Sequence, residues 1–156
     1  MRMQKAELVA KAYSDFSCFA KPKRLTKYDD DDLDCRDHER TLKELKREAL
    51  SIREIGPVSW SPIPFLNAEA MAYYLPRLIE FAVDNVNDID GDPFAIRFID
   101  FVVAGPKGEQ FASLREVQIG LVFQTVLYIK SHYDAVIRFQ LYSEDLDAAI
   151  VAWTHT

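Results

Sequence analysis

The sequence predicts an all-α, single-domain protein: a bundle of about five to seven helices with an ordered proline-rich loop. In most segments apolar residues recur at spacings of three and four, which is the helical period. Glycine is scarce, with 5 in 156 residues, which weighs against an all-β fold with many tight turns and against a glycine-rich nucleotide loop. No stretch has the composition or length of an interdomain linker, so residues 1–156 are expected to form one helical domain.

The N-terminal segment predicts a first helix over residues 4–19. Pro22 ends it, because the residue before a proline is pushed out of the helical region. Cys18 lies in the apolar pattern of this segment and is expected to be buried. Residues 1–27 hold seven lysines and arginines against two acidic residues, and we expect this excess to pair with acidic groups of the same chain.

A polar connector, residues 22–34, precedes a second predicted helix over residues 35–50. The connector ends in a tract of aspartates, which form poor helix interiors but suit a helix N-terminus, where the dipole attracts negative charge. We call these residues the acidic tract: Asp29, Asp30, Asp31, Asp32 and Asp34.

Three prolines exclude a regular helix from residues 56–66, so this apolar stretch is expected to pack on the body of the protein as an ordered loop. Asn67 then suits the N-cap of a third helix. Pro76 is expected to kink or split that helix, because its missing N–H removes one backbone hydrogen bond.

The next apolar segment, residues 93–103, is ambiguous. A helix that is apolar nearly all round would be the central, buried one. The same run of isoleucine, phenylalanine and valine also fits a β-strand, so both structures remain open at this point.

The C-terminal part predicts three further helices. Ser113 and Glu116 have the spacing of a capping box, which predicts a helix from Leu114 to about His132. A short helix is expected over 134–139, and Ser143 is the expected cap of the last one.

The charge excludes some function classes and favours others. The chain has 19 Lys and Arg against 25 Asp and Glu, a net charge of −6 that disfavours nucleic-acid binding and suits a basic protein partner. No run approaches the length of a membrane span, and polar residues interrupt any signal-peptide core. We therefore expect a cytoplasmic protein with two reduced cysteines.

Cys35 and His38 are the candidate metal ligands, because cysteine, histidine and carboxylate form the zinc ligand set and an i,i+3 spacing places both on one helix face. A structural zinc site needs four good ligands, so a capped helix explains this segment better. No sequence signature of nucleophilic catalysis accompanies the histidines, and we expect no cofactor and no catalytic residue.

Aromatic residues surround the proline-rich loop and predict a contact surface for a protein partner. Trp60 and Tyr73 are the residues of this kind assigned to partner binding, because tryptophan and tyrosine are enriched at interface hot spots. The acidic tract is the second part of the predicted surface. We expect the aromatic set mainly to attach the loop to the third helix, with part of its rim available to a partner.

Three blocks of this sequence resemble a family of small uncharacterised bacterial proteins. They are Lys21 to Tyr28 with the Cys-x-x-His block Cys35 to Leu42, Trp60 to Pro76 with its Tyr-Tyr-Leu-Pro run, and the ending Ala148 to Trp153. Relatives often carry a second cysteine or a histidine just ahead of the Cys35 position, where this chain has aspartates. The resemblance implies that any metal site there is lost, and it implies a shared fold more than an activity.

Two functions follow as hypotheses. The first is a non-enzymatic binding protein that neutralises or escorts a toxin or effector, in the manner of an immunity protein or antitoxin. The second is a small metal-dependent domain or enzyme that uses Cys35, His38 and neighbouring acids. The oligomeric state and the identity of the partner are not indicated by the sequence.

Overall fold

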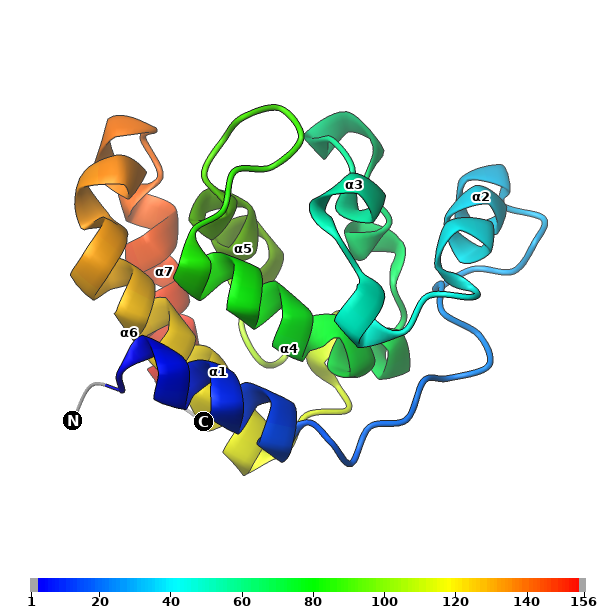
Figure 1. Cartoon of the computed structure of the whole chain (residues 1–156), viewed down its shortest axis with the longest axis horizontal. Coiled ribbons are helices and arrows are strands. Elements are labelled where there is room, and N and C mark those ends of the chain that lie inside the picture. Colours follow the sequence, from blue (N-terminus) through cyan, green and yellow to red (C-terminus); the bar gives the residue numbers. More distant parts are fainter. Residues whose placement is uncertain (1–2, 155–156) are drawn as a thin grey trace.

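The structure, a computed structural model that describes residues 3–154, confirms the all-α class (Figure 1). Within these residues the β-type pairing is limited to two isolated bridges. The α-helices are α1 (Lys5–Asp15), α2 (Leu33–Leu42), α3 (Ile52–Ile55), α4 (Ala68–Asp84), α5 (Phe94–Val102), α6 (Glu116–Phe139) and α7 (Ser143–Thr154). Single 3-10 turns join them: η1 (Arg47–Ala49), η2 (Val58–Trp60), η3 (Ile63–Phe65) and η4 (Glu109–Phe111).

Helix α4 is the centre of the bundle. Twelve of its 17 residues are buried, and it contacts α1, α5 and α6. The predicted cap is confirmed, since the Asn67 side chain accepts a hydrogen bond from the Ala70 N–H at 2.8 Å. Pro76 lies inside α4 without splitting it, because residues on both sides of the proline pack into the same core.

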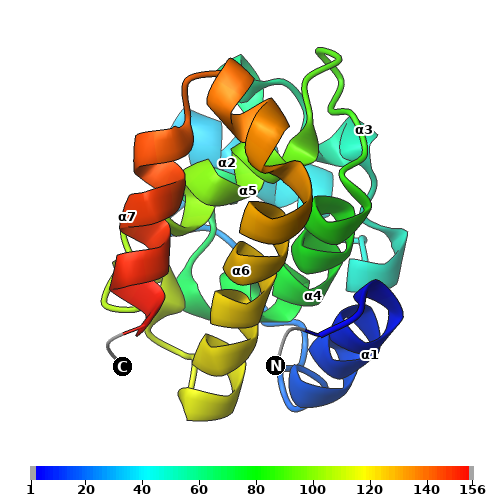
Figure 2. The ribbon, with the colours of Figure 1, turned by 90° about the vertical axis from the view of Figure 1, so that its left-hand side faces the viewer.

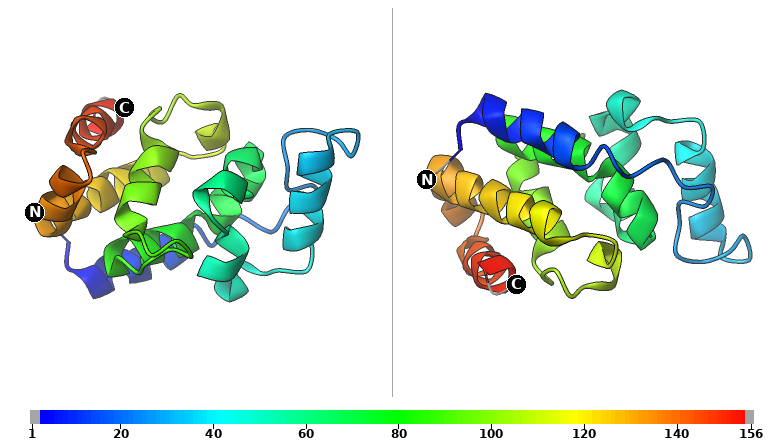
Figure 3. Two further views of the ribbon diagram at one scale, coloured as in Figure 1. Left: turned by 90° about the horizontal axis from the view of Figure 1, so that it is seen from above. Right: turned by 90° about the horizontal axis from the view of Figure 1, so that it is seen from below.

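The ambiguous segment 93–103 is a helix, α5, with seven of its nine residues buried. The helix is buried as predicted and packs against α4, α6 and α7, although α4 contributes more residues to the core. Figure 2 shows α7, α6 and α4 side by side with α1 beside α4, and Figure 3 shows α1 running along α6.

Helix α6 joins the two helices predicted over 114–139. Tyr133 has non-helical angles, with φ −126° and ψ 15°, so the predicted boundary after His132 is a kink. The capping box predicted at Ser113 is wrong. The helix begins at Glu116, and the Gln118 side chain accepts a hydrogen bond from the Arg115 N–H at 2.8 Å instead.

The continuous second helix predicted over 35–50 is also wrong. After α2 the chain turns, because long side chains from elsewhere bind the carbonyl groups that a continuing helix would use. The Tyr74 hydroxyl donates to the Leu45 carbonyl at 2.6 Å, and the Lys21 ammonium donates to the Leu42 carbonyl at 3.0 Å. Helix α2 stands at one end of the long axis (Figures 1 and 3).

Cys18 is exposed, which corrects the expectation that it is buried. Helix α1 ends at Asp15, so the following turn no longer follows the helical period. The ring of Phe16 fills the core, while Cys18 turns outward.

The basic N-terminal segment pairs with acidic groups of the same chain, as expected. Lys5 in α1 contacts Asp84 in α4, and Arg24 lies within 3.3 Å of Glu39 in α2. Over residues 3–154, no helix combines the length and apolar character needed to cross a membrane.

Gly105 allows α5 and α7 to approach each other closely. Its φ is +84°, and a Cβ added there would lie 2.9 Å from the Ala152 Cβ.

We expect Gly105→Ala to destabilise the protein by more than the roughly 1–2 kcal/mol that a left-handed L-residue costs, because overpacking adds to that cost. Urea unfolding measures the difference. Gly91→Ala is the control, since Gly91 has a φ of +87° with nothing near its Cβ position; equal losses in both variants would contradict the packing argument.

Candidate functional site

The acidic tract lies at the N-terminus of α2, where the sequence places it. The Asp32 side chain caps the helix by accepting a hydrogen bond from the Cys35 N–H at 2.9 Å. Asp30 pairs with Arg24 at 2.9 Å. Asp29, Asp31 and Asp34 are exposed, so part of the tract can contact a partner.

Cys35 and His38 share the buried face of α2. The His38 ring packs between two aromatic rings, with centroids 4.4 Å from Trp60 and 4.8 Å from Phe65. Burial lowers the pKa of His38, so the imidazole is neutral at pH 7. In the part of the chain that the structure describes, no group of three or more His, Cys, Asp or Glu side chains could hold a metal ion.

The two aromatic residues assigned to partner binding lie in different environments. Trp60 is 45% exposed on η2, beside α2. Tyr73 is only 6% exposed; its hydroxyl accepts a hydrogen bond from the Arg47 N–H, and the Arg47 guanidinium lies 4.5 Å from its ring centroid. Tyr73 therefore attaches η1 to α4, and we do not include it in a contact surface.

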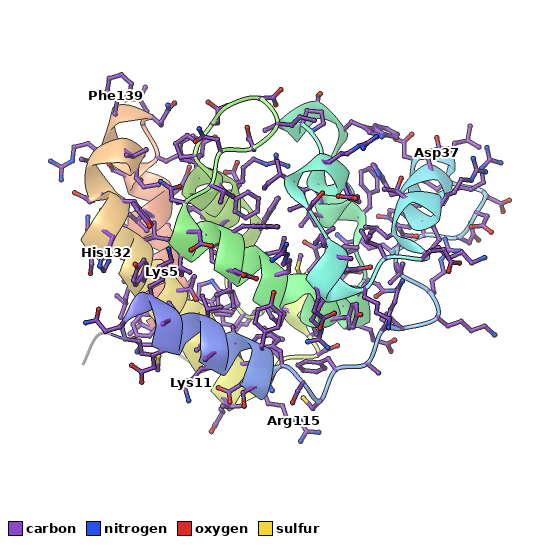
Figure 4. All side chains as sticks on the ribbon, viewed as in Figure 1. Lys5, Lys11, Asp37, Arg115, His132 and Phe139 are labelled. Carbon is purple, nitrogen blue, oxygen red and sulfur yellow. The ribbon has the colours of Figure 1, made fainter. Side chains whose placement is uncertain are left out.

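The structure reveals an exposed apolar group that sequence reasoning missed. At the turn between α6 and α7, Phe139 is 83% exposed and Leu141 is 90% exposed. Figure 4 shows Phe139 at the upper end of the molecule, at the opposite end of the long axis from Asp37 in α2. Val58 and Ile89 are more than half exposed. We call Val58, Ile89, Phe139 and Leu141 the apolar rim.

A cavity of about 170 Å³ lies among the segments that carry the apolar rim. It is formed by η2, the loop 85–93, α5 and the α6–α7 turn. We call it the acidic pocket. Its lining residues are Val58, Asp88, Asp92, Ile96, Arg97, Asp100, Gln140 and Tyr142.

The base of the acidic pocket is a buried ion pair. The Arg97 guanidinium lies 3.4 Å from the Asp88 carboxylate and donates to the Gly56 carbonyl at 2.8 Å. The other oxygen of Asp88 accepts hydrogen bonds from the N–H groups of Asp90 and Asp92, both at 2.9 Å. These bonds hold the loop 85–93 and leave Asp88 and Arg97 with no net charge between them.

The remaining acidic groups around the pocket have no cationic partner within residues 3–154. They are Asp92, Asp100 and Asp145. Partial burial and the charge of Asp145 raise the pKa of Asp100, although Arg97 opposes this shift. The charge of Asp100 in turn raises the pKa of Tyr142, with burial as a further cause. Since Val58 and Ile96 supply apolar walls, the pocket has the chemistry to receive a lysine or arginine side chain.

Comparison of the chain with protein-family models, with curated proteins and with solved structures finds no match. The resemblance to a small bacterial family therefore stays a prediction.

The raised pKa of Asp100 makes stability depend on pH. The folded state binds this proton more tightly than the unfolded state, so ionisation of the carboxyl group costs stability as the pH rises. We expect Asp100→Asn to be more stable than the wild type at pH 7, and the gain to disappear below about pH 4, where both states are protonated. Urea unfolding at both pH values measures it, with the exposed Asp90→Asn as control. A gain that is the same at both pH values would contradict the assignment.

Proposed function

We propose that this chain is a non-enzymatic protein-binding protein whose acidic pocket and apolar rim bind a basic partner protein. The observation that carries the proposal is Leu141, a residue whose backbone and side chain are both unfavourable for the isolated protein.

Leu141 occupies the left-handed position that ends α6, with φ +65°. The Tyr142 N–H donates to the Ile137 carbonyl at 2.9 Å and the Leu141 N–H to the Arg138 carbonyl at 3.1 Å, which is the Schellman arrangement. Glycine or asparagine fits this position best, and a left-handed L-residue costs roughly 1–2 kcal/mol. The leucine side chain recovers none of that cost by packing within the chain, since it is 90% exposed.

Next to Leu141, the acidic pocket carries unpaired negative charge that the isolated protein also stabilises poorly. A partner that inserts a lysine or arginine beside Asp100 would offset its repulsion by Asp145, and its apolar side chains would cover Phe139 and Leu141. Charged groups at such an interface steer association and make it dependent on salt. The exposed part of the acidic tract and Trp60 extend this surface toward α2 as a secondary contact.

The finer proposal is a cytoplasmic protein of the immunity or antitoxin type, which neutralises or escorts a toxin or effector. Two unpaired cysteines and the net charge of −6 support it. An acidic surface of this kind could cover a basic functional site on the partner.

Capture from a lysate of the native host tests the partner. We expect the tagged protein to retain a basic partner in stoichiometric amount at low salt and to release it as salt rises, since screening shortens the range of the attraction. Mass spectrometry identifies the partner, and the isolated pair is then titrated. Asp92→Asn with Asp100→Asn is expected to weaken binding by about tenfold or more.

The matched control is Glu109→Gln with Glu116→Gln. It removes the same number of charges from exposed positions on η4 and at the start of α6, beside Arg115 at the lower side in Figure 4. This control is expected to bind as the wild type does. Absence of any specific partner at either salt concentration, or equal weakening by both double variants, would overturn the proposal.

Leu141→Gly separates stability from binding. We expect it to raise the free energy of unfolding by about 0.5–1 kcal/mol, because relief of the left-handed strain exceeds the entropy cost of glycine. The same substitution is expected to weaken partner binding. Urea unfolding and titration with the captured partner measure the two effects, and Val117→Ala, an exposed apolar residue at the other end of α6, serves as control. Unchanged affinity would contradict a role for Leu141 in binding.

A further inference from the structure

A second cavity, of about 250 Å³, lies between α2, α3 and η2. Its lining residues are His38, Thr41, Arg53, Glu54, Gly56, Pro57, Trp60 and Pro62, and we call it the histidine pocket. Turn η2 contributes to both cavities, with Val58 on the acidic pocket and Trp60 on the histidine pocket. The two sites therefore share a wall but not their chemistry.

The walls of the histidine pocket suit a flat apolar group. Trp60, Pro57 and Pro62 present rings to the cavity. One part of the Trp60 indole packs on His38, and the side chain still keeps 45% of its surface exposed. Aromatic rings stack well on such surfaces.

Two polar groups of the histidine pocket, those of His38 and Arg53, have no hydrogen-bond or ion-pair partner among the described residues. His38 is 1% exposed, and its Nε2 atom has no hydrogen-bond partner among residues 3–154. A buried polar atom without a partner destabilises the protein, because it has lost its hydrogen bonds to water. Arg53 is exposed at the pocket and forms no ion pair within the described chain. The Arg53 guanidinium is a donor, and His38 donates through Nε2 whenever that nitrogen carries a proton, so a carboxylate acceptor suits both groups.

The acidic groups around His38 are engaged or exposed to solvent. The Glu54 carboxylate of α3 accepts hydrogen bonds from the Ser51 N–H, at 3.1 Å, and from the Ser51 hydroxyl. Asp34 and Asp37 of α2 act on the imidazole through their charge, but both lie at the surface, where water and salt screen them. No ionisable side chain of η2 or η3 lies against His38, since these turns hold none.

We propose that the histidine pocket binds an aromatic carboxylate, with its ring against Trp60 and its carboxylate between the Arg53 guanidinium and the His38 imidazole. The anion supplies an acceptor to both groups, and the ring fills the space between tryptophan and prolines. A bound anion also favours the charged imidazolium, so binding raises the pKa of His38 and strengthens as the pH falls.

Nuclear magnetic resonance of the full labelled chain tests the site, with indole-3-carboxylate as probe and the uncharged indole-3-carboxamide as the matched ligand. We expect the carboxylate to shift the His38 and Trp60 side-chain resonances with a dissociation constant below about 1 mM, and the amide to bind about tenfold more weakly. The indole of Trp153, buried and bonded to the Val102 carbonyl at 2.7 Å, is an internal reference that should not move.

Substitution of Arg53 keeps the test independent of folding, because this side chain is exposed while His38 is part of the core. Arg53→Gln is expected to reduce affinity about tenfold and Arg53→Lys to restore part of it, whereas Arg36→Gln, an exposed arginine of α2 outside the pocket, has no effect. A titration of His38 with and without the probe must show a higher pKa in the complex.

Three results would overturn the proposal: no shift at about 1 mM probe, equal affinity for acid and amide, or a His38 pKa that the probe leaves unchanged. A peptide ending in tryptophan carries the same ring and carboxylate on a chain. Tighter binding of that peptide than of the free acid assigns the aromatic carboxylate to a protein terminus, and the reverse assigns it to a free small molecule.

Discussion

The fold depends on covering a helix that is apolar on almost every side. Twelve residues of α4 are buried, and a helix of this kind is stable only when neighbours surround it. Helices α1, α5 and α6 supply most of that cover. The polar tips of Tyr73 and Tyr74 reach past the core to Arg47 and Leu45, so the same helix also fixes the irregular chain between α2 and α3. Both candidate sites are built on segments that α4 holds in place directly or through α5.

Local signals in the sequence were sufficient where local forces decide the structure. The Asn67 cap, the break near Tyr133 and the aspartate cap of α2 were all predicted from neighbouring residues alone. The prediction of one helix over 35–50 was wrong because its end depends on contacts from Lys21 and Tyr74, which are distant in sequence. Cys18 was assigned to the core for a similar reason: the helical period was extended beyond the residue at which α1 ends.

The candidate site was less predictable than the fold. The sequence placed Trp60 and the acidic tract at the surface, and it grouped Cys35 with His38 on one face. It gave no sign that Val58, Asp100 and Tyr142 line one cavity, because these residues come together only when α5, η2 and the α6–α7 turn pack. The positive φ of Leu141 is equally hidden, since glycine, which would mark such a position in a sequence, is absent there.

The reactivity of Cys35 reports when α2 detaches from the rest of the protein. Cys18 is exposed, whereas Cys35 is completely buried on the inner face of α2, so a thiol reagent reacts with the two sulfurs at different rates. Modification of Cys35 requires α2 to leave the body, which breaks the stacking of His38 and the hydrogen bonds that Glu39 accepts from Leu25 and Thr26. Each labelling rate is divided by the rate of the same cysteine in the unfolded chain. The ratio of the two normalised rates then measures the free energy of detaching α2 from the rest of the protein, with no added probe group.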